Sequence, residues 1–247
     1  MKKWSSNVTT SRKTALAVGV LFILTFITSI GAVLAYGNIL SDPGYITGSG
    51  PSTGVFLGAF LELFLIVTNI GCAVVLFPLL KRTNEALALA YVAERLVEGT
   101  FILIGLLSLL TIVTLRQTAA GTDAGALMAI DKTFLAIHQW TFLLGPSFAD
   151  GIGTGLILGY LMYRSGLVGR RMALFGLVGG PLLVTVAAAI LLGVIPLGSP
   201  LQGIMTGPEI IWEAFLGLYL TFHGFKAAPI PASEDRQQRG APALAAA

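Results

Sequence analysis

The sequence has few charged residues. Lys, Arg, Asp and Glu make up 11% of its 247 residues, hydrophobic residues make up 55%, and the mean hydropathy is +0.85. Soluble domains carry about 25% charged residues, because their surface must interact with water. The composition therefore excludes a soluble globular protein. The single cysteine, Cys72, also excludes an intrachain disulfide and any metal site built from several cysteines.

Histidine is equally scarce, since the chain has only His138 and His223, which we expect at opposite ends of a helical bundle. A bis-histidine haem is therefore not expected. The sequence lacks H-E-x-x-H and Glu-x-x-His patterns, a nucleophile elbow and a phosphate loop. The glycine-rich run 151–155 follows no predicted strand, so it does not indicate a dinucleotide site. No haem, flavin or nucleotide signature is present, and a divalent metal held by carboxylates remains open.

Six apolar runs are long enough to cross a hydrocarbon core, which takes about 20 helical residues. They predict an all-α, polytopic membrane protein with a bundle of six transmembrane helices. The expected helices cover residues 14–36, 55–80, 86–115, 133–163, 172–194 and 208–225. The first run is too long for a typical signal peptide, so we expect it to be retained. Residues 1–13 form a basic cytoplasmic amino terminus, 14–225 the transmembrane domain, and 226–247 a tail whose composition predicts disorder.

The placement of Lys and Arg predicts the orientation, because basic residues accumulate in cytoplasmic loops. Twelve of the fifteen lie in residues 1–13, 81–85, 164–171 and the tail after 225. Both ends of the chain are therefore expected in the cytoplasm. The same dispersal argues against a nucleic-acid partner, which would need a basic face. The bilayer itself is the expected surrounding of the protein.

Ionisable residues inside apolar runs are the most informative feature, because a charge at mid-bilayer costs at least about 2.5–3.5 kcal/mol on insertion scales. Counting residues along each expected helix sorts them by depth into two tiers. The outer tier, the candidate ligand pocket and candidate metal site, contains Glu62, Glu98, His138 and Glu213. The second tier contains Asn69, Glu94, Arg95 and Asp150. Glu209 falls near the expected outer boundary, where water could hydrate it.

Three carboxylates and an imidazole could hold a divalent cation, bind a cationic or lipid-like ligand, or relay protons. The alternative for these residues is structural, since Arg95 and nearby carboxylates could form ion pairs that fix helix register. His138 could equally be a hydrogen-bonded residue at the membrane interface, where amphipathic side chains are common.

Small residues and prolines predict how the helices pack. Gly151, Gly155 and Gly159 recur every four residues and form one face that another backbone can approach closely. We expect this face to pack within the bundle, and it could instead serve a homodimer. Pro146 and Pro181 remove backbone donors and are expected to kink their helices.

Two segments carry a resemblance to a known family. Residues 90–99 (AYVAERLVEG) and the loop 163–171 (YRSGLVGRR) are similar to an uncharacterised bacterial membrane family, domain of unknown function 4386. The similarity extends from about residue 13 to 225, and Gly169 stands where the family usually has proline. The resemblance implies a bacterial inner-membrane protein, supplies no reaction, and directs attention to Arg95 and Glu98.

Three functions from different classes remain open. The preferred one is a membrane protein that binds a small ligand or cation in a buried carboxylate and histidine pocket opening to the outer side. The second is an intramembrane metal-assisted hydrolase acting on lipid, with the outer-tier residues as ligands or acid and base groups. The third is a small proton-coupled transporter, although the halves of the chain show only a faint repeat. No catalytic residue can be assigned.

Overall fold

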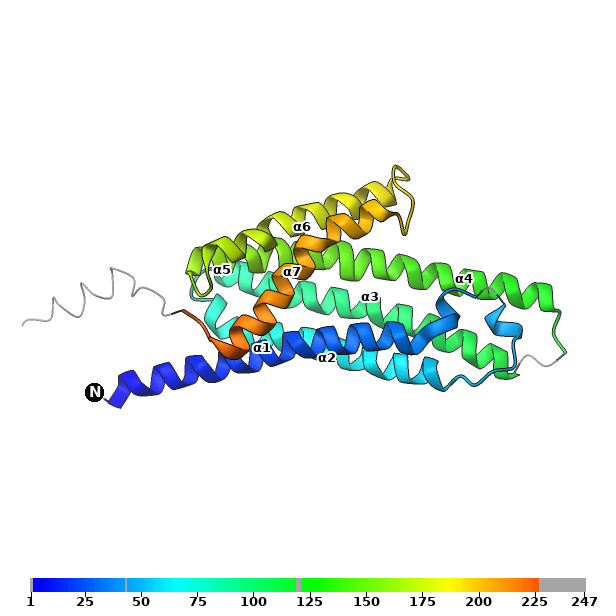
Figure 1. The fold of residues 1–247 in the computed structure, drawn as a ribbon, viewed down its shortest axis with the longest axis horizontal. Helices are drawn as coiled ribbons and strands as arrows, with labels where there is room; N and C mark the ends of the chain where they lie inside the picture. Colours follow the sequence, from blue (N-terminus) through cyan, green and yellow to red (C-terminus); the bar gives the residue numbers. More distant parts are fainter. Residues whose placement is uncertain (1, 43, 119–120, 227–247) are drawn as a thin grey trace, which may run out of the picture.

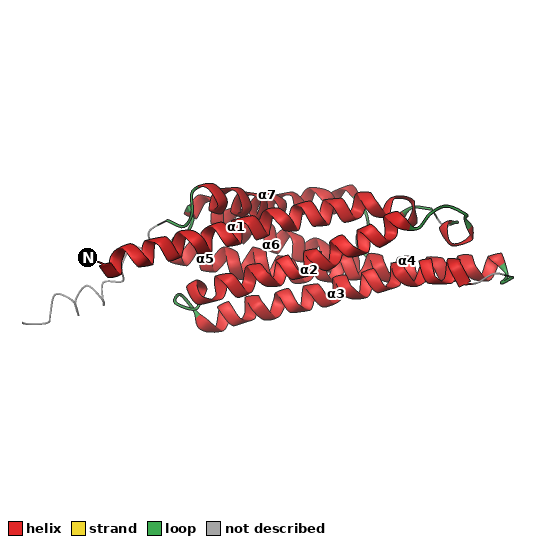
Figure 2. Ribbon diagram, turned by 90° about the horizontal axis from the view of Figure 1, so that it is seen from below, coloured by secondary structure: helices red, strands yellow, loops and turns green. Residues whose placement is uncertain are grey.

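The computed structural model describes residues 2–42, 44–118 and 121–226, and every regular element in them is helical (Figures 1 and 2). The elements are α1 (Lys2–Tyr36), the short 3-10 helices η1 (Gly37–Leu40) and η2 (Tyr45–Thr47), α2 (Thr53–Leu80), α3 (Glu85–Thr118), α4 (Ala124–Phe142), the π-helical segments η3 (Leu143–Ala149) and η4 (Gly151–Leu158), α5 (Gly159–Ser165), α6 (Arg170–Leu191) and α7 (Pro200–Phe222). Together α4, η3, η4 and α5 form one long helix. The predicted all-α fold is confirmed.

Five helical segments among the described residues are long and apolar enough to cross a membrane. They are Arg12–Leu40, Thr53–Leu80, Glu85–Thr118, Ala124–Ser165 and Arg170–Leu191. Helix α7 has 23 residues, which is a sufficient length. It is not among the five segments.

The helices form an elongated bundle, in which α7 runs obliquely from beside α6 to α1 (Figure 1). Helix α1 packs against α2 and α7, α3 against α2 and α4, and α6 against α7 and η4. One end of the bundle joins distant parts of the chain. There Arg12 donates to the carbonyls of Thr221 (3.1 Å) and Phe222 (3.0 Å), and the backbone N–H of Lys226 donates to Leu167 O (2.8 Å).

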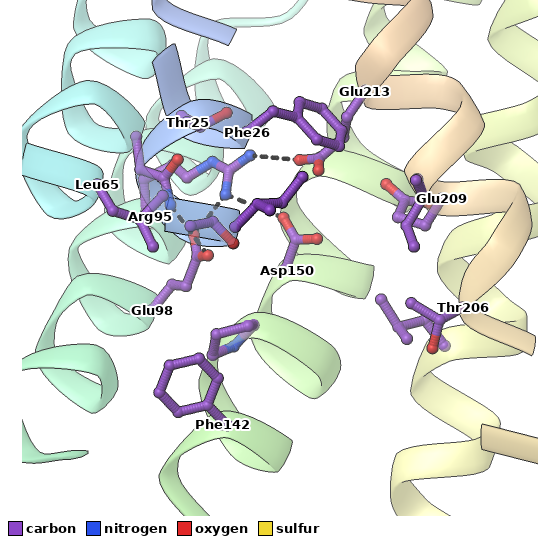
Figure 3. Close-up of a pocket in the computed structure, with 16 residues that line it drawn as sticks. Thr25, Phe26, Leu65, Arg95, Glu98, Phe142, Asp150, Thr206, Glu209 and Glu213 are labelled. Carbon is purple, nitrogen blue, oxygen red and sulfur yellow. Dashed lines mark hydrogen bonds and ion pairs between the residues drawn. The ribbon is translucent and has the colours of Figure 1, made fainter. Parts of the chain in front are cut away.

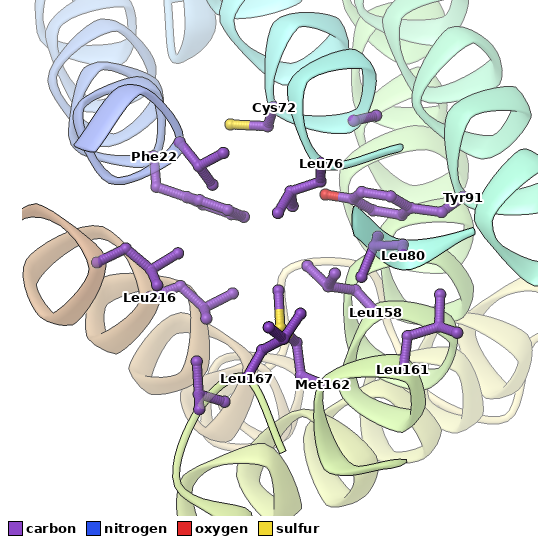
Figure 4. Packing of buried hydrophobic residues seen from close by; sticks show 14 of the residues in the cluster. Phe22, Cys72, Leu76, Leu80, Tyr91, Leu158, Leu161, Met162, Leu167 and Leu216 are labelled. Atoms are coloured by element: carbon purple, nitrogen blue, oxygen red, sulfur yellow. The ribbon is translucent and has the colours of Figure 1, made fainter. Parts of the chain in front are cut away.

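Apolar side chains fill both ends of the bundle. At the end that holds Arg12, residues of seven helical segments and of the loop after α5 meet, among them Phe22, Leu76, Leu161 and Leu216 (Figure 4). At the other end, α1 to α4 and the two 3-10 helices enclose a second cluster that includes Ile39 and Ile112. On α3 the buried charged residues 94, 95 and 98 lie between Tyr91 of the first cluster and Leu109 of the second, so packing at both ends positions the middle of the bundle.

Two helices begin earlier than their apolar runs predict. Helix α4 begins at Ala124 rather than 133, since Asp123 caps it by accepting from Ala126 N–H at 2.8 Å. Helix α7 begins at Pro200 rather than 208, because Ser199 is a capping residue and Pro200 occupies the first turn, where its missing N–H costs nothing. Hydropathy alone misses both starts. In α4 the charged pair Asp131 and Lys132 interrupts the apolar run, and in α7 the first two turns contain Gln202, Thr206 and two glycines.

Helix α1 also begins before its expected boundary, at Lys2 instead of residue 14. The expected basic amino terminus is therefore an extension of the helix. The expected tail, residues 226–247, falls outside the described residues except for Lys226.

The prolines singled out in the sequence lie in different surroundings. Pro146 lies inside the π-helical segment η3, and Pro181 lies inside α6. A π-helical segment shifts the hydrogen-bond ladder from i→i−4 to i→i−5, and such segments recur at functional sites. The irregularity of the fourth helix therefore extends well past its proline, through η4.

The glycine face of the fourth helix packs on α6. A Cβ on Gly151 would lie 3.0 Å from Gly180 O, and one on Gly159 would lie 3.1 Å from Leu177 N. A Cβ on Gly155 would overlap Gly180 itself. This is the intramolecular packing that the spacing predicts. A homodimer through the same face would require α6 to move away.

Gly180→Ala should therefore destabilise the protein, because its methyl group would overlap three backbone atoms of η4, in Gly151, Gly155 and Leu156. Overpacking of this kind costs about 1–3 kcal/mol. Gly203→Ala in α7 is the matched control, since nothing lies within 4 Å of the added Cβ. Thermal unfolding of the purified protein should show a lowered Tm for the first variant and an unchanged or slightly raised Tm for the second. Equal Tm values would contradict the packing.

Candidate functional site

The centre of the candidate site is Arg95, on α3. Its side chain is fully buried, and the residue is only 1% exposed. Tyr91, Arg95 and Glu98 are spaced by four and three residues, so they share one face of α3. That face points toward η4 and α7, which bring a hydroxyl and carboxylates from far along the chain.

Three carboxylates from three segments pair with the guanidinium (Figure 3). Glu98 Oε2, from the same helix, forms the closest ion pair with Nη1. Asp150 Oδ1, at the junction of η3 and η4, lies 2.9 Å from Nη1 but outside hydrogen-bond geometry. Glu213 Oε1, on α7, lies 3.3 Å from Nη2. A single cation thus connects α3, the fourth helix and α7.

Neutral groups complete the hydrogen bonds of this cluster. Thr154 Oγ1 accepts from Arg95 Nη2, and Tyr91 OH accepts from Arg95 Nε at 3.4 Å. Asn69, on α2, donates to Glu98 Oε1 at 3.1 Å. Trp212 Nε1 donates to the carbonyl of Thr154 at 3.1 Å, which ties α7 to η4 a second time. All three nitrogens of the guanidinium therefore have partners.

Two further carboxylates are buried here without hydrogen bonds. Glu94 Oε2 lies 4.0 Å from Arg95 Nε, at the outer limit of an ion pair. Glu209 is only 2% exposed, and neither of its oxygens has a partner among the described residues. Glycine makes room for both. A Cβ on Gly153 would overlap the Glu94 carboxylate, and one on Gly179 would lie 2.6 Å from Glu209 Oε2.

A cavity of about 290 Å³ lies beside the cluster. Arg95, Glu98, Asp150, Glu209 and Glu213 line its charged side, with Glu209 facing the Arg95 group across the space (Figure 3). The remaining wall is largely apolar or weakly polar; it includes Thr25, Phe26, Ser29, Ile30, Leu65, Asn69, Phe142, Pro146, Leu183, Thr206 and Ile210. One cation and four acids thus face a single space of small-molecule size.

The structure does not group the candidate residues into the two tiers that their estimated depths predict. Glu98 and Glu213 lie with Arg95, in the set that also contains Asn69, Glu94 and Asp150. Glu62 and His138 are buried, but neither lines the cavity. This is a correction to the two-tier grouping. Depth along a helix axis does not specify the direction in which a side chain points, and helix tilt changes the depth itself.

Glu62 and His138 belong to a separate polar group around Tyr36. Tyr36 OH donates to Glu62 Oε2 at 2.7 Å, and the Tyr36 ring meets the His138 ring edge-on at 6.2 Å. His138 stacks on Phe142 with ring centroids 4.6 Å apart, while its Nε2 is buried without a partner among the described residues. The contact with Phe142 places this group directly behind the cavity wall.

Glu209 is the site residue that the sequence analysis set aside. The expected start of the helix at 208 put Glu209 at the boundary, whereas the actual start at Pro200 places roughly 12 Å of helix before residue 208. The Ser199-Pro200 pair is the signal that could have revealed this. Thr154 and Trp212 had no comparable signal, because their roles depend on contacts between distant segments.

The cluster also contains the arrangement that a metal ion would need. One oxygen each of Glu94, Glu98 and Asp150 lie within 4.8 Å of one another. Oxygen ligands of this kind suit hard divalent cations. The Arg95 guanidinium pairs with two of the three, however, so its charge opposes a second cation at the same oxygens.

An all-helical chain with five apolar helices of spanning length around a buried charge cluster has the features of a multi-pass membrane protein. The chain belongs to the family described as domain of unknown function (DUF4386), whose model matches residues 17–224. The resemblance seen in residues 90–99 and 163–171 is thereby confirmed. No curated protein and no solved structure matched the chain.

Removing the central cation should destabilise the bundle strongly. Arg95→Met leaves Glu98, Asp150 and Glu213 buried without their partner, and breaking a buried pair in this way costs about 3–5 kcal/mol. Thermal unfolding in detergent should show a large loss of Tm, partly restored when Glu98→Leu is added. Arg164→Gln, at an exposed position, is the control. An Arg95→Met protein as stable as wild type would show that the cluster does not hold the helices.

Proposed function

We propose that this protein is a six-helix membrane protein of the bacterial inner membrane that binds a small organic cation in the central cavity. The observation that carries the proposal is the excess of acid. Four carboxylates and one guanidinium line the cavity, and Glu94 adds a fifth carboxylate behind it. Arg95 neutralises only part of this charge, so a further positive group would be bound favourably.

Glu209 is the residue best suited to receive the cation. Both of its oxygens are buried, unpartnered within the described chain, and adjacent to the cavity. A carboxylate in such surroundings gains most from a charge-assisted hydrogen bond, since nothing else satisfies it. Glu213 lies one turn further along α7 and could contribute its second oxygen.

The apolar part of the wall indicates what the rest of the ligand is like. Phe26, Leu65 and Phe142 face the same space as the acids. Ile30 and Ile210 also line it while being 56% and 49% exposed, so the cavity reaches the apolar surface between α1 and α7. A ligand with an ammonium group and an apolar body would fit both the acids and this lateral mouth.

The sixth span and the orientation are part of the proposal. The start of α1, the loop after α5 and the end of α7 lie at one end of the bundle, as the hydrogen bonds of Arg12 and Lys226 require. With the start of α1 and the end of α7 on one side, the number of crossings is even, which supports α7 as the sixth span. The basic residues gather at this end, which supports a cytoplasmic location for it.

Reporter fusions test this topology. Green fluorescent protein fused after residue 226 should fluoresce, because it folds in the cytoplasm, while alkaline phosphatase fused there should be inactive. Phosphatase inserted after Thr122, in the loop between α3 and α4, should be active outside the cytoplasm. An active phosphatase at the carboxyl end would indicate five crossings and would overturn the proposed orientation of α7.

Binding is tested with benzyltrimethylammonium and its uncharged isostere neopentylbenzene, measured by calorimetry on the full-length protein in nanodiscs. The cation should bind, and the neutral compound should bind at least about tenfold more weakly. Glu209→Gln should weaken cation binding by a similar factor, because it removes the unpaired charge while keeping the shape. Glu85→Gln, at the exposed start of α3, is the matched control.

Two results would contradict the proposal. One is equal binding of the charged and neutral compounds, which would show that the apolar wall binds them and that the carboxylates contribute nothing. The other is the absence of binding across a series of benzylammonium ions from primary to quaternary.

Elemental analysis of the same preparation, beside Glu98→Gln and Glu213→Gln, tests a metal site instead. Stoichiometric metal that both variants lose would favour metal-assisted chemistry.

Transport is the second candidate function, and the irregular fourth helix favours it. Asp150 lies between two π-helical segments, and Pro146 in the first of them lines the cavity. Binding sites of secondary transporters are commonly formed where spanning helices are interrupted. Uptake of labelled benzyltrimethylammonium into proteoliposomes that depends on a pH gradient would establish it, and binding without uptake would leave a binding protein.

A further inference from the structure

A second pocket lies at the other end of the bundle, away from Arg12. It has a volume of about 380 Å³ and is formed by the loop between α1 and α2 together with the end of α3. Its lining includes both charged and aromatic residues, among them Tyr36, Asp42, Tyr45 and Arg116. None of these residues takes part in the Arg95 cluster.

Arg116 is held in place but only partly satisfied. Its Nε donates to Gly48 O at 2.9 Å, and its guanidinium lies over the Tyr45 ring at 4.3 Å from the centroid. Its Nη1 is buried and has no hydrogen-bond partner among the described residues. Glycine at positions 48 and 50 keeps other side chains away from Nη2, since added Cβ atoms there would lie 3.5 and 3.7 Å from it.

The opposite charge faces the same pocket. Asp42 is exposed, and only its Oδ1 is used, as the acceptor of Gly44 N–H at 2.8 Å. Within the described ranges no ion pair joins Arg116 to a carboxylate.

Two opposite charges that share a pocket without pairing suit a ligand that carries both. An anionic oxygen pair can bind the open edge of a guanidinium in a bidentate manner, which satisfies a donor such as Nη1. An ammonium group can reach Asp42 at the same time. A ligand with one charge alone would leave the opposite group of the pocket unpaired.

We propose that the pocket of Arg116 and Asp42 binds a zwitterion, with its carboxylate or phosphate on Arg116 and its ammonium on Asp42. Free amino acids and the headgroup of an aminophospholipid both have this chemistry. The site is independent of the central cavity, because it uses other residues at another part of the fold. It gives the protein a second recognition function at the end expected to face the outside.

Calorimetry on the detergent-purified full-length protein tests the proposal with four probes. Glycine and O-phosphoethanolamine carry both charges, whereas acetate and ethylammonium carry one each. At least one zwitterion should bind at least about tenfold more tightly than either single-charge probe. Binding of O-phosphoethanolamine alone would identify a lipid headgroup as the source, and binding of glycine alone would identify a free amino acid.

Variants establish where the zwitterion binds. Arg116→Lys keeps a positive charge but loses the parallel N–H donors of the guanidinium. Asp42→Asn removes the negative charge at an exposed position, where the change should not affect folding. Each should weaken zwitterion binding at least about tenfold, while Lys132→Gln, exposed on α4, should leave it unchanged. The proposal is overturned if neither zwitterion binds, if acetate binds equally well, or if Asp42→Asn binds like the wild type.

Discussion

The buried guanidinium of Arg95 is the constraint on which the middle of this protein depends. A cation in a bundle of apolar helices must be paired, and its partners come from its own helix, from the junction at Asp150 and from α7. These segments are far apart in the sequence, so the ion pairs fix how α3, the fourth helix and α7 face one another. Apolar packing at both ends of the bundle then holds this arrangement in register.

Glu94 and Glu209, two buried carboxylates of this site that form no hydrogen bond among the described residues, need space as well as a compensating positive charge. Glycine supplies the space, because Gly153 lies against Glu94 and Gly179 against Glu209. Gly153 belongs to the π-helical segment η4, so the backbone beside Glu94 departs from the regular α-helical ladder, whereas Gly179 lies in the α-helix α6. The resulting cavity combines an acidic wall with an apolar mouth.

Much of the fold could be predicted from hydropathy, since long apolar runs have no alternative to a helical span. The starts of α4 and α7 could not be predicted from hydropathy, because Asp131 and Lys132 interrupt the apolar run of α4, and glycines and polar residues weaken that of α7. That error had a consequence for the site, as it left Glu209 at the expected membrane boundary. The chain's membership of the DUF4386 family was visible in residues 90–99 and 163–171, and the family model extends it to 17–224.

The sequence by itself determined that this is an all-helical, membrane-type protein and which ionisable residues its interior contains. It did so because composition and the lengths of apolar runs can be counted directly in the sequence. Only the tertiary structure decided which of those residues meet. Glu98 and Glu213 join Arg95 while Glu62 joins Tyr36, because helix rotation and tilt set side-chain direction. Those two variables follow from the packing of all the helices together, which no single run of residues specifies.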